Sequence, residues 1–124
     1  MTRSLPASLE GKTAYLATAD EGGVPHLAVG EVEGQASGGV LFRGWLCPRT
    51  LANLDANRRV ALAVGLGPDG VQLVGTVEEK SVDAVLDGYG LASEDVPQVR
   101  YRLVVRPAEA LRMTDRAHTD RPLP

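Results

Sequence analysis

Hydrophobic and polar residues alternate in short runs along this chain, and turns containing glycine or proline separate the runs. Alternation with a period of two is typical of a strand that buries one face. The segments with this pattern are residues 13–19, 26–33, 40–45, 60–66, 71–78 and 99–105, and a last short strand is expected over residues 109–113. The chain is therefore predicted to be mainly β.

Two or three short helices are expected between the strands. Residues 5–10 carry Pro6 near the start of a helix and are followed by Gly11, a residue that commonly ends one. Residues 48–57 place leucines at helical spacing after Pro48, which suits a first helical position. Residues 81–89 begin with Ser81, a good helix cap, ahead of apolar residues at helical spacing.

The order of these elements predicts an antiparallel barrel. Residues 20–23, Asp-Glu-Gly-Gly, form a turn that joins the first two strands as a hairpin. Closely spaced hairpins favour an antiparallel sheet closed into a barrel, and the absence of βαβ alternation argues against a doubly wound fold. We expect one domain over residues 1–113, with a loose, polar, proline-rich tail over residues 114–124.

Composition narrows the function classes without choosing one. The chain has 124 residues and a net charge of −3, with no dense run of Lys or Arg, so a general nucleic-acid binder is not expected. No apolar run is long enough to span a bilayer, and the N-terminus lacks the apolar core of a signal peptide. The single cysteine, Cys47, fits a reducing compartment. We expect a cytoplasmic protein.

The segment that carries candidate chemistry is the end of the third strand and the helix after it. The first turn of a helix has free backbone N–H groups and a partial positive charge. Arg49 and Thr50 lie in that turn, where a cation is locally unfavourable, and Cys47 is a poor cap. An anion at this helix end explains both oddities, with Arg43 as a second cation. The alternative is a surface arginine at an ordinary helix start.

Other reactive residues are isolated. Trp45, the chain's one tryptophan, is either a core or interface anchor or a surface for a flat ring. His26, His118 and Cys47 are too far apart in sequence to indicate a zinc site, and no histidine lies near Cys47 to activate it. We expect neither a catalytic side chain nor a metal.

Three ordered motifs resemble the FMN-binding split-barrel family, the relatives of pyridoxamine 5′-phosphate oxidase. Residues 16–26, Leu-Ala-Thr-Ala-Asp-Glu-Gly-Gly-Val-Pro-His, resemble the family's opening hairpin. Residues 48–62, from Pro-Arg-Thr-Leu to Val-Ala-Leu, resemble its phosphate-binding helix and the next strand, and residues 71–78 resemble the strand after that. The agreement spans about residues 5–113, and the compact size is similar to that of the small bacterial FMN-binding proteins.

The resemblance implies a six-stranded split barrel that dimerises and holds FMN in a groove at the subunit interface. By position, Arg49 and Thr50 hold the phosphate, and Arg43 and Gly44 lie beside the phosphate or ribityl chain. The strand backbone at Ala28, Val29, Gly30 and Glu31 lies along the isoalloxazine ring. Trp45 completes the set of candidate cofactor-binding residues.

The expected function is that of an FMN-binding homodimer that acts as an oxidoreductase or carries electrons to a small molecule or a redox protein. One alternative keeps the fold with another cofactor, either the deazaflavin F420 or haem, for which His26 is the candidate axial ligand. Another alternative is a cofactor-free dimeric scaffold or regulatory protein. It rests on Ala28, where many relatives carry a basic residue, and on Glu31, an acid beside an electron-rich ring.

Overall fold

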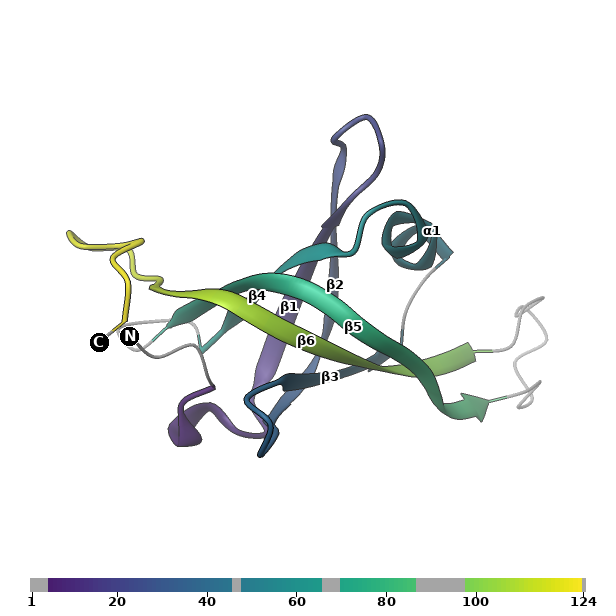
Figure 1. The fold of residues 1–124 in the computed structure, drawn as a ribbon, viewed down its shortest axis with the longest axis horizontal. Helices are drawn as coiled ribbons and strands as arrows, with labels where there is room; N and C mark the ends of the chain where they lie inside the picture. Colours follow the sequence, from purple (N-terminus) through teal and green to yellow (C-terminus); the bar gives the residue numbers. More distant parts are fainter. Residues whose placement is uncertain (1–4, 46–47, 66–69, 87–97, 124) are drawn as a thin grey trace.

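Six antiparallel strands close into a barrel in the computed structural model, which describes residues 5–45, 48–65, 70–86 and 98–123 (Figure 1). Around the barrel the order is β1-β2-β3-β6-β5-β4. The strands are β1 (Thr13–Ala19), β2 (Pro25–Gly34), β3 (Val40–Trp45), β4 (Arg59–Val64), β5 (Val71–Leu86) and β6 (Gln98–Arg112). The expectation of a mainly β, six-stranded antiparallel barrel is confirmed.

Apolar residues at alternate positions of every strand fill the barrel interior. On β1, for example, Ala14, Leu16 and Thr18 are buried. The alternate residues Thr13 and Tyr15 are exposed. Phe42 from β3 and Leu62 from β4 are fully buried near the centre. Because side chains of a strand alternate between two faces, closure of the sheet places one set inside and leaves the other set on the outer surface.

Strands β5 and β6 form a long two-stranded ribbon that crosses the molecule and extends beyond the barrel (Figure 1). The pairing shifts at three bulges, one of which sets Gly75 opposite Pro107. A side chain at Gly75 would collide with the backbone of Arg106, so glycine is required at this close approach. Proline lacks the N–H that a regular ladder uses, and the irregular pairing accommodates it.

The structure corrects the helix count. The described residues contain one α-helix, α1 (Pro48–Ala56), and one short 3₁₀ helix, η1 (Ala7–Leu9). The helix predicted over residues 81–89 is wrong as far as residue 86, because Val82 and Val85 pair with Tyr101 and Val99 of β6. Residues 87–89 lie outside the described residues. Over so short a segment, the spacing of apolar residues does not distinguish a helix from a strand. Pairing with β6 selects the strand.

The two segments expected as separate final strands, residues 99–105 and 109–113, belong to the single strand β6 as far as Arg112. Beyond β6 the chain turns back on itself: the Leu123 amide donates to the Ala110 carbonyl at 2.9 Å, and the Arg112 amide donates to the Arg121 carbonyl at 2.9 Å. Leu123 packs against the core. No helix among the described residues has the length and apolar character needed to cross a membrane.

Arg106 on β6 connects three parts of the barrel surface. Its Nε and Nη2 donate to Glu78 Oε1 and Oε2 at 3.0 and 3.2 Å, and its Nη1 donates to the Ser37 carbonyl at 3.0 Å. The hydrogen bonds and positive charge of Arg106 lower the pKa of the Glu78 carboxyl, and Glu78 in turn raises the pKa of Arg106. A carboxyl whose pKa is lowered by folding stabilises the fold above its ordinary pKa, and this contribution disappears as the pH falls through the lowered value.

We therefore expect Arg106→Met to lower the thermal midpoint at pH 7, and we expect the difference from the wild-type protein to shrink as the pH falls below the ordinary carboxyl range. Thermal unfolding followed by circular dichroism between pH 2 and 8 measures it. Arg112→Met is the control, because Arg112 is an exposed arginine of the same strand without an ion pair to any described residue. A difference that stays constant across this pH range would contradict the assigned ion pair.

Candidate functional site

The backbone brings the predicted site segments of β2 and β3 together. Glu31 of β2 pairs directly with Arg43 of β3. At the next positions the strands approach so closely that a side chain on Gly30 would collide with the Arg43 carbonyl and the Phe42 ring. A Cβ on Gly44 would lie 2.9 Å from the Val29 carbonyl oxygen. Glycine at both positions permits this approach, which no other residue could match without moving the strands.

Predicted site residues divide between the two faces of the barrel wall. Ala28 packs against the core, and Gly30 lies opposite the buried Ala14. Val29 and Trp45 face outward, with 54% and 45% of their surface exposed, and Arg43 is half-buried on the same outer face. Only the outward residues can offer side chains to a ligand outside the barrel, so Ala28 and Gly30 can contribute only backbone there.

Helix α1 is held against the barrel by its inner side. Leu54 is buried in the core, and Leu51 packs against it. The buried Asn53 donates from Nδ2 to Thr18 Oγ1 on β1 at 3.0 Å. An ion pair of 3.4 Å between Lys80 Nζ and Asp55 Oδ1 joins the helix to β5 at the surface. These contacts fix the orientation of the helix and hence the direction in which its first turn opens.

Arg49 lies on the outer side of that first turn and is exposed. Its guanidinium has no hydrogen bond or ion pair to any residue that the structure describes. The first turn holds no acidic side chain that would compensate the helix dipole. The exposed Arg49 guanidinium therefore lies at the positive end of the α1 dipole, as an anion site requires.

The Thr50 side chain does not lie where its expected role of holding the phosphate requires. This side chain is fully buried on the inner side of α1, and the residue already takes part in an interaction. A ligand on the outer surface cannot reach this buried hydroxyl. Cys47, the poor cap that precedes Pro48 in the sequence, lies outside the described residues.

Charged residues that the sequence did not single out surround Arg43. Arg102 of β6 pairs directly with Arg43, and Arg100 pairs with Trp45. Asp83 of β5 lies between two of these arginines: its Oδ2 is 3.9 Å from Arg43 Nε and 3.5 Å from Arg100 Nε. The alternation around Arg100 and Arg102 marks an outward face in the sequence. Their meeting with Arg43 depends on the β3–β6 pairing, which sequence alone does not reveal.

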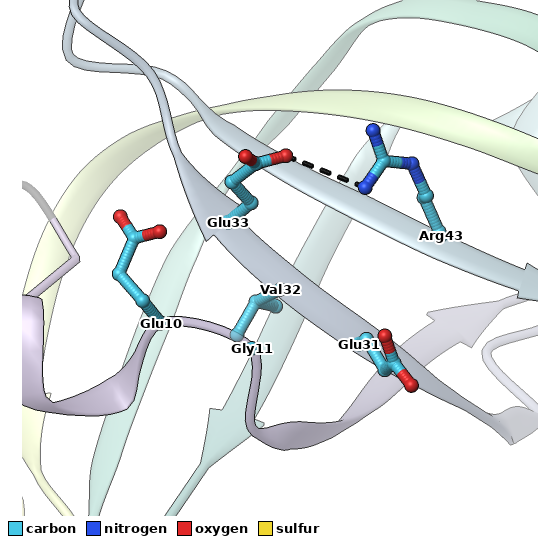
Figure 2. A pocket seen from close by; sticks show the side chains of 6 residues that line it. All are labelled: Glu10, Gly11, Glu31, Val32, Glu33 and Arg43. Carbon is cyan, nitrogen blue, oxygen red and sulfur yellow. Dashed lines mark hydrogen bonds and ion pairs between the residues drawn. The ribbon is translucent and has the colours of Figure 1, made fainter.

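A hollow of about 350 Å³ lies beside Arg43, on the outer face of β2 (Figure 2). Three carboxylates line it, those of Glu10, Glu31 and Glu33, and Glu33 Oε2 accepts from Arg43 Nη1 at 3.3 Å. Glu10 is held by the Gly34 amide, which donates to its Oε1 at 2.9 Å. This surface repels a phosphate. The anchor for an anionic group is therefore expected outside this hollow.

The described residues contain no cluster of three or more His, Cys, Asp or Glu side chains arranged to hold a metal ion. His26 is half-buried on β2 and takes part in an interaction, and His118 is exposed.

Comparison with known proteins supports the family assignment. The family model for pyridoxamine 5′-phosphate oxidase matches residues 7–113 of this chain. No curated protein is significantly similar to it in sequence. The family match covers all six strands and α1, which are the elements that form the barrel and the candidate site.

Solved structures share this fold at low sequence identity. An F420 reductase has a TM-score of 0.59 and 22% identity over 86% of this chain and 98% of its own. HupZ from Group A Streptococcus has a TM-score of 0.60 and 13% identity over 94% and 98%. A Clostridium acetobutylicum protein related to general stress protein 26, of the pyridoxinephosphate oxidase family, has a TM-score of 0.58 and 19% identity over 81% and 78%.

The buried hydrogen bond between Asn53 and Thr18 should stabilise the packing of α1 against β1. Thr18→Val removes the acceptor and leaves a buried amide unsatisfied, which we expect to lower the free energy of unfolding by about 1–3 kcal/mol. The double variant Thr18→Val/Asn53→Leu replaces both partners by apolar groups of similar shape and should recover most of this loss. Urea unfolding measures both, and equal losses in the single and double variants would contradict the assignment.

Proposed function

Because the chain belongs to the pyridoxamine 5′-phosphate oxidase family, we propose that it is a homodimeric FMN-binding protein that acts in oxidation–reduction or electron transfer. The observation that carries the proposal is the exposed Arg49, which has no partner among the described residues, at the open first turn of α1. A phosphate monoester fits this donor set, because helix amides and a guanidinium bind the same doubly charged group.

The ring system would lie along the outer face of β2 and β3. Val29 and Trp45 offer apolar surface there, and glycine at Gly30 and Gly44 lets β2 and β3 approach closely beneath it. The bound flavin would supply the redox chemistry, and this chain would supply the phosphate anchor and the environment of the ring. The residues act by binding and orienting, and we assign no side chain a catalytic role.

A second copy of the chain would cover the apolar outer face of β2, β1, β4 and β5. The strand pairings set Leu27, Ala17, Ala61 and Val74 in one row across these strands. Tyr15 stands in the neighbouring row between Val29 and Ala63. Leu27 is 65% exposed, and the central alanines are small enough to let another surface approach closely. Exposed apolar patches of this kind commonly mark interfaces.

A phosphorylated deazaflavin is the second candidate cofactor. The same donors would bind its phosphate, and the similarity of fold to an F420 reductase favours it over the remaining alternatives. A haem protein and a cofactor-free scaffold are also distinguishable outcomes. The visible spectrum of the purified protein, and of the protein after addition of each cofactor, separates all four.

For the phosphate anchor, we expect Arg49→Ala to weaken FMN binding by about tenfold or more, since a hydrogen bond to a charged group contributes about 1.5–3 kcal/mol. Titration of FMN fluorescence measures the dissociation constant. Arg58→Ala is the matched control, because Arg58 is an exposed arginine just past the opposite end of α1. Equal affinities of the wild-type protein and Arg49→Ala would remove the phosphate assignment.

For the dimer, we expect Val29→Asp to convert the protein to a monomer, because it places a charge in the proposed apolar interface. Sedimentation equilibrium measures the mass. Val82→Asp makes the same change at an equally exposed valine of the β5–β6 ribbon, away from this face, and should stay dimeric. A wild-type protein that sediments as a monomer would refute the dimer directly.

A further inference from the structure

Three arginines gather on the outer face where β3 meets β6. Arg43 and Arg102 are direct cross-strand partners, and Arg100 lies two residues along β6. Like charges placed directly opposite each other in an antiparallel ladder are destabilising. The chain as a whole carries a net charge of −3, so this local concentration of positive charge is not a consequence of its composition.

Arg102 is the least satisfied of the three. Its Nε is buried from solvent and has no hydrogen-bond partner, the one such side-chain atom among the described residues. Its guanidinium also has no ion pair with any residue that the structure describes. A buried donor on a charged group that lacks an acceptor costs free energy, and such groups are rare in native proteins. The position therefore calls for an acceptor from outside the described chain.

The nearby carboxylates do not supply that acceptor. Asp83 is shared by Arg43 and Arg100, and Glu33 is bound to Arg43. The ion pairs of these carboxylates go to Arg43 and Arg100, and none of them reaches Arg102. The side chains of Arg43 and Arg100 are each 34% exposed, so the face that they flank is open to a ligand.

We propose that Arg102, together with Arg43 and Arg100, binds a small anion through a carboxylate or phosphate group on the outer face of β3 and β6. A guanidinium presents paired N–H donors that match the two oxygens of either group. Ser81, the cross-strand partner of Arg102 on β5, places a hydroxyl-bearing residue next to the same position. The site does not depend on a flavin, and its residues other than Arg43 are separate from the proposed phosphate anchor at α1.

Trp45 gives this site its own reporter. It is the chain's one tryptophan, it is exposed, and it pairs with Arg100 across the β3–β6 ladder. Its flat apolar surface beside the arginines favours an organic anion over a bare ion, because the body of such a ligand can rest on the indole. Inorganic phosphate and acetate are the simplest probes of the anionic group, and they distinguish phosphate from carboxylate recognition.

The experiment monitors the Nε–H group of Arg102 directly. In ¹H–¹⁵N spectra of the full chain, we expect the Arg102 Nε–H signal to shift saturably on addition of inorganic phosphate or acetate, with Trp45 fluorescence changing at the same concentrations. Sodium chloride at matched ionic strength should not reproduce the shift. Arg102→Gln should weaken binding about tenfold or more, whereas Arg106→Gln, on the same strand, should not change it.

A second variant tests the site with Arg102 in place. Asp83→Asn removes the carboxylate that competes for Arg43 and Arg100, so it should tighten anion binding severalfold. An Arg102 signal that stays unmoved by both probes, or binding that requires Arg49 and ignores Arg102, would overturn the proposal. Because the readout is taken without flavin, failure of the flavin proposal and failure of this site are separate results.

Discussion

The pairing of β3 with β6 is the constraint on which the rest of this structure depends. This ladder, with that of β1 and β4, turns a set of hairpins into a closed barrel. Closure gives every strand an inside and an outside, so Phe42 and Leu103 enter the core while their neighbours Arg43 and Arg102 must face outward. The same ladder that assembles the core therefore assembles the arginines on the surface.

Helix α1 depends on a second, smaller set of contacts. Its inner side is anchored by Leu54 and by the hydrogen bond from Asn53 to Thr18, and this anchoring leaves Arg49 on the outer side. The burial of Thr50 is a consequence of the same orientation. If the helix were rotated by one residue, Arg49 would take the buried position of Thr50. The seating of α1 on β1 thus determines which donors a ligand can reach.

Surface charge divides the candidate region into two parts. On the β2 side of Arg43, three glutamates form an acidic hollow. On the β6 side, Arg100 and Arg102 make the surface positive, apart from Asp83. Anionic ligands are therefore directed away from β2 carboxylates and toward α1 or β6. Both the flavin proposal and the anion proposal use the positive part, at different elements of the fold.

Much of the barrel could be predicted from local pattern. The strand over residues 40–45, the helix beginning at Pro48 and the turn at Gly22 and Gly23 follow from side-chain alternation and from the properties of proline and glycine. The prediction was wrong over residues 81–86, where helical and extended spacing are alike in so short a segment. There the hydrogen bonds to β6 decide, and they depend on residues far along the chain.

For the candidate site, the sequence alone determined the members that lie close together in the chain, from Arg43 to Thr50, because a helix start and its first cation are local features. Only the tertiary structure decided that Arg49 faces outward while Thr50 is buried, and that Arg43, Asp83, Arg100 and Arg102 share one surface. The physical reason is that burial and cross-strand contact are set by pairing between distant segments. Such pairing cannot be recognised from the sequence of one segment alone.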